Sequence, residues 1–267
     1  NLSQISSADV KKHIIERNLY GVDIEKGAVD IARLRLWLSL IIEEDTPTTL
    51  PNLEFKIIQG NSLMEIYDSK YFNKIDLNDI SKLMRDLYSV KDHATKVELR
   101  NEITDYLKQY ISLYSSEVQT ESDLTALPIP NDVFTLWHVY FKEVFDEGGF
   151  DIVIGNPPYV ESKNYIESSP LLAKYIKEVY SCSNVGKVDL CIPFIEMGIN
   201  LLNERGTLNY LTQRRFFMSE YGNLIREKIR EENLLKRIYE YHQTDLFKGK
   251  ITYVAELMLQ KNNNLQH

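Results

Sequence analysis

The stretch FDIVIGNPPYV, Phe150 to Val160, predicts a buried strand that ends in a rigid loop. Its apolar, largely β-branched run from Ile152 to Ile154 is typical of a strand inside a sheet. The strand is expected to stop at Gly155, because the two prolines that follow fix φ and offer no backbone N–H. Asn156 and Tyr159 would then lie at the carboxyl end of the strand, where open α/β sheets bind ligands. The alternative is a plain turn, since Asn-Pro and Pro-Pro are common turn formers.

The first quarter of the chain alternates between helical and strand patterns, which is typical of a parallel sheet with crossover helices. A short amphipathic helix with Ser7 as its N-cap opens the alternation. The segments in order are a helix at 3–17, a strand at 19–24, a helix at 28–42 and a strand at 53–58.

Two polar residues follow these strands directly. Asp23 ends the first strand, where a carboxylate in a nucleotide-binding sheet commonly accepts hydrogen bonds from ribose hydroxyls. It could equally be an acid that stabilises the positive end of the next helix dipole. Asn61, in Gln59-Gly60-Asn61-Ser62, could pair with an adenine edge or cap a helix that starts near Ser62.

Residues 65–149 interrupt the alternation and predict a helical insertion, because neighbouring strands are usually connected by far fewer residues. Helices are expected at 80–88, 96–114 and 134–145, with a polar loop at 115–132. His138, in the last of these helices, is expected to be a packed rather than a catalytic histidine.

The remaining chain predicts a polar segment at 161–187 and a second series of helices and strands. These are a helix at 187–202, a strand at 206–211, a helix at 221–231, a strand at 234–239, the loop DLFKGK at 245–250 and a strand at 252–259.

Composition indicates an ordinary globular protein of 267 residues, with 43% hydrophobic and 26% charged residues. No stretch approaches the roughly 20 apolar residues of a membrane span, and no secretory signal opens the chain. Cys182 and Cys191 lack the spacing of a zinc site and are expected to be buried, reduced thiols in a cytoplasmic protein. The net charge of −8 argues against a broad nucleic-acid footprint on this chain, so DNA contacts must be local or supplied by another part.

The segments GVDIEKGAVDIARLRLWLSL, IIQGNSL, FDIVIGNPPYV, GTLNYLTQRRFF and DLFKGKITYVAELML occur in the order expected of amino-group DNA methyltransferases. The chain most closely resembles the adenine-N6 methyltransferase part of Type IIG restriction–modification enzymes and related phage-defence methylases. The resemblance implies an α/β fold with a Rossmann-like sheet that uses S-adenosyl-L-methionine. It divides the chain into 1–64 and 150–267, the two parts of a methyltransferase domain, and the insertion 65–149.

The resemblance also implies roles for individual residues. Asn156, with its side-chain carbonyl, and Pro157, with its backbone carbonyl, would accept hydrogen bonds from the target amino group. Pro158 completes the rigid loop, and Tyr159 would stack on the flipped base. The site residues that the resemblance implies for the cofactor are Asp23, Ile24 and Asn61. Phe247 matches an aromatic residue that contacts the flipped base from its other side.

Two features depart from the family pattern. The 267 residues contain no glycine-rich loop of the F/P-x-C-G-x-G type, which in the family follows the first strand and encloses the methionine part of the cofactor. They also contain no recognisable target-recognition domain or nuclease motif. The chain begins with Asn1, so we expect a part of a longer polypeptide that lacks its first strand and is inactive by itself. Double-stranded DNA would bind through the missing recognition domain. The full-length protein could also carry a linked nuclease domain.

Two other readings stay open. A protein-glutamine or ribosomal-RNA methyltransferase also uses Asn-Pro-Pro-Tyr on planar amides or bases. A catalytically inert protein that keeps the methyltransferase fold would explain the missing glycine-rich loop.

Overall fold

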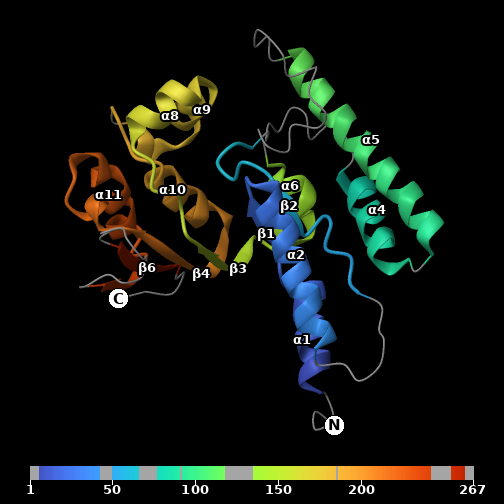
Figure 1. Ribbon diagram of the computed structural model, residues 1–267. Coiled ribbons are helices and arrows are strands. Elements are labelled where there is room, and N and C mark those ends of the chain that lie inside the picture. Colours follow the sequence, from blue (N-terminus) through green and yellow to red (C-terminus); the bar gives the residue numbers. More distant parts are fainter. Residues whose placement is uncertain are drawn as a thin grey trace. The chain divides into compact units, whose positions relative to one another are not determined.

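The computed structural model describes residues 6–42, 50–65, 77–90, 92–117, 135–184, 186–241 and 254–261. The chain forms two compact units, Asn1–Lys142 and Glu143–His267 (Figure 1). The expected division at 64/65 and 149/150 stays a prediction.

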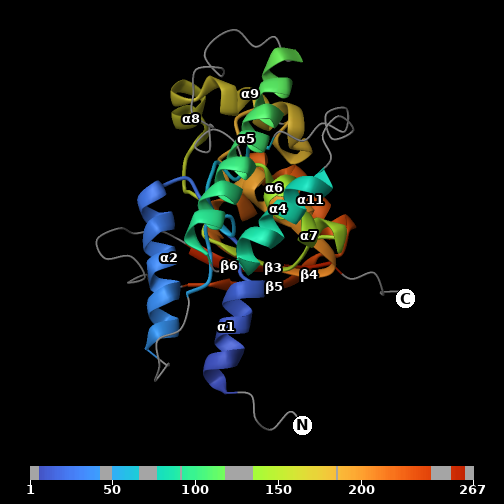
Figure 2. The same cartoon turned by 90° about the vertical axis from the view of Figure 1, so that its right-hand side faces the viewer.

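Unit 1 opens with the expected alternation of helices and strands. Its elements are α1 (Ser7–Arg17), β1 (Gly21–Asp23), α2 (Lys26–Ile41) and β2 (Ile57–Gln59). The two strands pair in parallel, with Asp23 opposite Gln59. Helices α1 and α2 contact each other, and Figure 2 shows them side by side.

Two details of unit 1 differ from the expectation. The N-cap of α1 is Ser6 rather than Ser7, because the Ser6 hydroxyl accepts the Asp9 N–H (3.0 Å) and the Asp9 carboxylate accepts the Ser6 N–H (3.3 Å). Strand β2 is shorter than 53–58, because the N–H groups of Lys56 and Ile57 turn back to the Leu53 carbonyl (3.1 and 3.0 Å).

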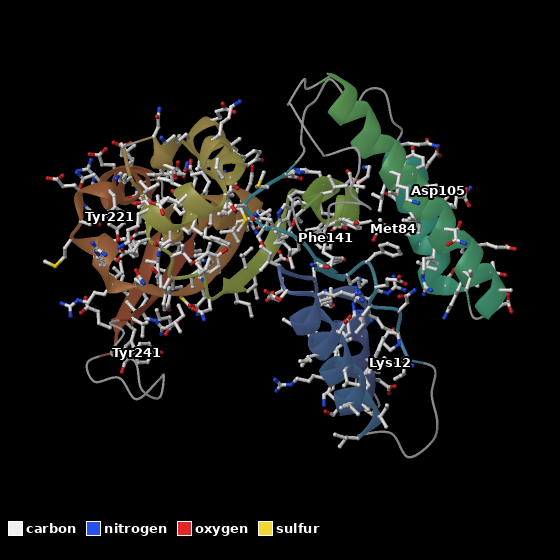
Figure 3. All side chains as sticks on the ribbon, turned by 45° about the horizontal axis from the view of Figure 1, so that its top comes forward. Lys12, Met84, Asp105, Phe141, Tyr221 and Tyr241 are labelled. Atoms are coloured by element: carbon white, nitrogen blue, oxygen red, sulfur yellow. The ribbon has the colours of Figure 1, made fainter. Side chains whose placement is uncertain are left out.

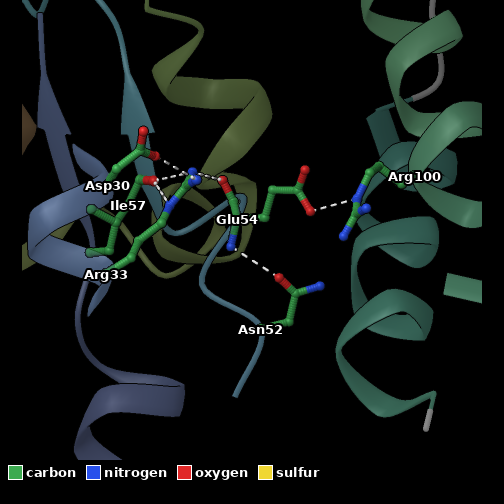
Figure 4. A network of polar contacts seen from close by, with 6 residues as sticks. All are labelled: Asp30, Arg33, Asn52, Glu54, Ile57 and Arg100. Atoms are coloured by element: carbon green, nitrogen blue, oxygen red, sulfur yellow. Dashed lines mark hydrogen bonds and ion pairs between the residues drawn. The ribbon is translucent and has the colours of Figure 1, made fainter. Parts of the chain in front are cut away.

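Arg33 on α2 connects the helix to the turn before β2 (Figure 4). Its Nε donates to the Ile57 carbonyl (2.9 Å), and its Nη2 donates to the carbonyls of Glu54 (2.7 Å) and Ile57 (2.6 Å). Beneath this contact lies a small core of Ile15, Val29, Leu40, Leu53 and Ile57. The pattern of Ala28 to Ile42 thus forms a helix that a partly buried arginine connects to β2.

The described residues of the expected insertion are helical and contain no strand, as the sequence predicts. The helices are α4 (Leu77–Ser89), α5 (His93–Glu117), α6 (Trp137–Tyr140) and α7 (Lys142–Asp146). α4 and α5 pack against each other through buried residues such as Met84, whereas Asp105 on α5 is exposed (Figure 3). Arg100 on α5 forms an ion pair with Glu54 (2.6 Å), so this helical pair is tied to the turn before β2.

The prediction of a single helix at 134–145 is wrong, because this segment forms two helices, α6 and α7, that are separated at Phe141. The Phe141 backbone leaves helical geometry (φ −118°, ψ 31°). Its ring is 1% exposed and meets Tyr20 and Trp137 edge to face, with centroids 5.1 and 5.5 Å apart. Burial of this ring beside β1 therefore interrupts the helix.

Unit 2 contains a four-stranded mixed sheet in the order β3-β4-β6-β5. The strands are β3 (Phe150–Gly155), β4 (Leu202–Gln213), β5 (Leu235–Glu240) and β6 (Val254–Gln260). β3 and β4 are parallel, with Gly155 opposite Tyr210, and the other two pairs are antiparallel. The expected mostly parallel sheet is therefore wrong for β5 and β6, which follow each other in the chain and pair directly.

Two helices lie in the segment at 161–187, for which the sequence predicted only a polar character. They are α8 (Ser162–Ser168) and α9 (Pro170–Val179), and they are followed by α10 (Cys191–Leu201) and α11 (Asn223–Glu231). α10 and α11 pack on one face of the sheet, where Ile192, Ile195, Leu208, Ile225 and Leu257 form the core. Cys182 and Cys191 are buried there as free thiols, as expected.

Strand β3 lies at the edge of this sheet rather than in its interior, which corrects a central expectation. Among the described residues it pairs with β4 alone. Val153 faces the core, whereas Ile152 and Ile154 point to the opposite face and are 68% and 77% exposed. The apolar run predicts a strand covered on both sides, and the described residues cover only one of them.

Candidate functional site

The predicted site residues fall into two groups, one in each unit. Asp23, Ile24 and Asn61 lie at the carboxyl ends of β1 and β2 in unit 1. The loop Asn156 to Tyr159 lies at the carboxyl end of β3 in unit 2. Phe247 lies outside the described residues.

The parallel register brings the first group together. Because Asp23 pairs with Gln59, the chain segments that leave both strands start beside each other. The Gly60 N–H donates to the Asp23 carbonyl (2.9 Å), and the Gln59 side chain donates to the Ile24 carbonyl (3.1 Å). The two loops therefore form one polar edge, the nucleoside edge, defined as Asp23, Ile24 and Asn61.

The side chains of this edge suit the nucleoside half of a cofactor. Asp23 is exposed, and its Oδ1 accepts the Glu25 N–H (2.8 Å), which leaves Oδ2 to accept from hydroxyl groups. Ile24 is 54% exposed and offers an apolar surface next to this carboxylate. An exposed carboxylate beside an apolar side chain fits a ribose and a flat heterocycle.

Within the described residues 61–65, positions 62–63 form a turn and no helix begins at Ser62, so the expected helix cap is not seen there. Its Oδ1 accepts the Leu63 N–H (3.1 Å), and its backbone carbonyl accepts the Met64 N–H (3.1 Å). The amide is thereby fixed at the start of the turn, with its Nδ2 hydrogens available to donate to an acceptor such as a ring nitrogen.

The second group is the loop Asn156 to Tyr159, whose asparagine is accessible to solvent. Pro157 is buried, while Asn156 and Pro158 are exposed. The Asn156 amide has no hydrogen-bond partner in the part of the chain that the structure describes. Tyr159 is half-buried, and its hydroxyl donates to the Leu211 carbonyl (3.4 Å) on β4. Burial raises the pKa of the Tyr159 hydroxyl, so it stays a neutral donor at physiological pH.

The loop is closed by contacts that sequence reasoning missed. The Leu190 N–H donates to the Val160 carbonyl (3.0 Å), and the Ser162 N–H donates to the Asp189 carboxylate (3.2 Å). Asp189 is 6% exposed. The sequence hint for this contact is that Asp189 is the one acid in the apolar stretch VDLCIPF. Its partner Ser162 lies 27 residues away, so the sequence does not identify it.

In addition to these hydrogen bonds, an ion pair connects the end of the loop to the segment after β4. Arg215, in a short 3-10 helix after β4, donates to the Glu161 carboxylate (3.1 Å). Its neighbour Phe216 is fully buried in the unit 2 core. The RRFF segment thus anchors one side of the loop through Phe216 and contacts it through Arg215.

Two other kinds of site were sought in the described ranges. No group of three or more His, Cys, Asp and Glu residues there is placed to hold a metal ion. None of the helices in those ranges combines the length and apolar character required to cross a membrane.

Comparison with known proteins gives a consistent result. A model of the Eco57I restriction-modification methylase family matches residues 17–247. The Type II restriction enzyme and methyltransferase RM.Eco57I of Escherichia coli is 25% identical over 263 residues, which cover 96% of this chain and 20% of that protein. The Type II methyltransferase M.BstVI of Geobacillus stearothermophilus is 31% identical over 131 residues, covering 49% of this chain and 22% of that protein. The chain thus spans about a fifth of the length of these relatives.

The fold is similar to that of a solved restriction–modification enzyme. The nuclease-deletion mutant of the Type ISP enzyme LlaGI, solved with a DNA substrate mimic, superposes with a TM-score of 0.52 and 15% sequence identity. The match covers 98% of this chain and 18% of that one. The predicted α/β fold class is thereby confirmed.

Proposed function

The chain belongs to the Eco57I restriction-modification methylase family, and on that basis we propose that it serves methyl transfer from S-adenosyl-L-methionine to N6 of adenine in DNA. The observation that carries this proposal is the exposed Asn156 amide on a proline-fixed loop at the carboxyl end of β3. The similarity to RM.Eco57I over 96% of the chain supports it.

The nucleoside edge would hold the cofactor. Asp23 Oδ2 would accept from the ribose hydroxyls, Ile24 would pack on the adenine ring, and Asn61 Nδ2 would donate to it. When bound, S-adenosyl-L-methionine supplies an electrophilic methyl group on a sulfonium centre.

The Asn156 loop would bind and orient the target amine. An exocyclic amine is a poor nucleophile, because its lone pair is shared with the ring. The Asn156 side-chain oxygen and the Pro157 backbone carbonyl would accept hydrogen bonds from its two N–H groups. This would localise the lone pair on the nitrogen. This is catalysis by positioning and by preorganised dipoles, and no general base has to ionise first.

The target base has to leave the duplex to reach this loop, at a cost of a few kcal/mol. Stacking on the half-buried Tyr159 ring would offset part of that cost. The hydrogen bond from Tyr159 to Leu211 would hold the ring in a fixed orientation while the base binds.

The test is transfer of a labelled methyl group to synthetic duplexes by the longest natural polypeptide that contains these residues. We expect label at adenine N6 in duplexes that carry the recognition site and none in duplexes whose target adenine is replaced by purine. Label on protein glutamine or on ribosomal RNA, with unlabelled DNA, would refute the proposal.

A further inference from the structure

The turn that carries Asn61 is held by a segment far along the chain. Residues Thr135 to His138, the brace, lie beside residues 61–65 although more than 70 positions separate the two. The Thr135 N–H donates to the Met64 carbonyl (2.7 Å), and the Trp137 Nε1–H donates to the Ser62 carbonyl (3.0 Å).

His138 adds two contacts to the brace. Its backbone N–H (3.0 Å) and its ring Nδ1 (2.7 Å) both contact Glu65 Oε1. Both side chains are partly buried, with 30% of His138 and 18% of Glu65 exposed. A hydrogen bond to a charged group in such surroundings contributes more to positioning than one in water.

The brace is itself anchored to the sheet that forms the nucleoside edge. Thr135, Leu136 and Trp137 are buried, and the Trp137 ring meets Phe141 edge to face. Phe141 in turn contacts Tyr20, the residue before β1. Asn61 therefore lies between two supports, β2 on one side and the brace on the other.

We propose that Trp137 and His138 are positioning residues that fix the 61–65 turn and so aim the Asn61 amide at the cofactor adenine. This inference rests on the proposed function, because it assigns the brace to the same cofactor edge. It gives the far end of the 65–149 segment a role in cofactor affinity, and His138 acts through Glu65 without touching the cofactor.

The first measurement needs no cofactor. In His138→Ala, hydrogen exchange at the Leu63 and Met64 amides should rise at least tenfold, while exchange at Ile57 and Ile58 in β2 changes little. His138→Asn should restore the wild-type pattern, because its Nδ2 can replace Nδ1 as the donor to Glu65. Ile15→Val serves as the control, since it lowers the stability of unit 1 without touching the turn and should raise exchange evenly. If exchange in His138→Ala rose equally at the turn amides and in β2, the proposed role of the brace would be overturned.

The second measurement titrates the same variants with S-adenosyl-L-methionine and follows amide shifts at Asp23 and Asn61 by NMR. His138→Ala should weaken binding about tenfold, which corresponds to about 1.4 kcal/mol, and His138→Asn should bind like wild type. If His138→Ala raised exchange at the turn amides but left the cofactor affinity unchanged, the role of the brace in cofactor binding would be overturned. No response in wild type up to tens of millimolar would refute both the proposed cofactor edge and the brace's role at it. If the chain binds the cofactor as expected but the longest natural polypeptide does not methylate DNA, the brace stays supported and only the proposed reaction is refuted.

Discussion

Asn156 combines two properties that the proposed acceptor of the target amine requires. Its side chain is accessible, and its backbone is fixed between a sheet strand and the buried Pro157. Asp189 and Arg215 secure the loop from the other side through Ser162 and Glu161. The backbone around Asn156 is thus held by the sheet and by these contacts, while its side chain stays exposed.

Asn156→Ala should lower methyl transfer by a factor of about 10²–10³, or about 2.7–4 kcal/mol, with cofactor affinity little changed. The reason is that the lost acceptor acts mainly in the transition state. The measurement is single-turnover methylation of duplex DNA by the longest natural polypeptide that contains the chain. Asn164→Ala, on the adjacent helix α8, is the control and should keep full activity. Activity of Asn156→Ala within tenfold of wild type would remove Asn156 from the mechanism.

Arg33 is the residue on which the entry to β2 depends. Burial lowers the pKa of its guanidinium, but the group stays charged and donates to two backbone carbonyls. Arg33→Met should therefore cost about 1–3 kcal/mol in the free energy of unfolding, because the carbonyls of Glu54 and Ile57 lose their donor.

Urea unfolding monitored by the fluorescence of Trp37 and Trp137 would measure this cost. Arg35→Met, two positions along the same helix and exposed, is the matched control and should change stability by less than about 0.5 kcal/mol. Equal effects of the two substitutions would show that the contacts in Figure 4 do not stabilise unit 1.

At the scale of elements, the start of β3 depends on backbone geometry. Gly148 and Gly149 both have positive φ, 97° and 117°. A Cβ on Gly149 would also lie 2.7 Å from the Leu201 carbonyl oxygen, where α10 ends beside β4. The two glycines therefore let the chain turn into β3 close to the end of α10.

Gly149→Ala should destabilise unit 2 by more than about 1 kcal/mol, because both the backbone conformation and the contact distance are unfavourable for a side chain. Gly27→Ala on α2 is the control, since nothing lies within 4 Å of the added Cβ. It should leave stability unchanged or raise it, because alanine favours helix. Thermal unfolding compares the two, and a neutral Gly149→Ala would contradict the geometry described for this turn.

At the scale of the whole molecule, the 267 residues should bind S-adenosyl-L-methionine no tighter than millimolar. The proposed hydrogen bonds of the Asp23 carboxylate would contribute about 1.5–3 kcal/mol to binding, and that of Asn61 roughly 1 kcal/mol. A millimolar complex already requires about 4 kcal/mol, and a micromolar one about 8 kcal/mol. The sequence contains no glycine-rich loop to enclose the methionine part.

Isothermal titration and NMR titration of the purified chain would measure this affinity. DNA affinity should be low as well, because the net charge of −8 opposes phosphate binding. A low-micromolar dissociation constant for the cofactor would show that other residues of the chain complete the site.

Local patterns determined the parts of the structure that depend on neighbouring residues. The β-branched run before Gly155, the two prolines after Asn156 and the alternation of residues 7–59 each act within a few positions, and β3, its loop and the αβαβ order follow from them. The placement of Asp23 and Asn61 beside each other followed too, because parallel strands present their carboxyl ends at one edge.

Tertiary structure decided whatever depends on residues far apart in the chain. The brace joins Glu65 to His138, the loop anchor joins Asp189 to Ser162, and Phe141 breaks a helix to reach Tyr20. The antiparallel pairing of β4 with β6 and the edge position of β3 in the described sheet are of the same kind. Local propensity carries no information on such partners, because the free energy that selects them arises only when the segments are packed together.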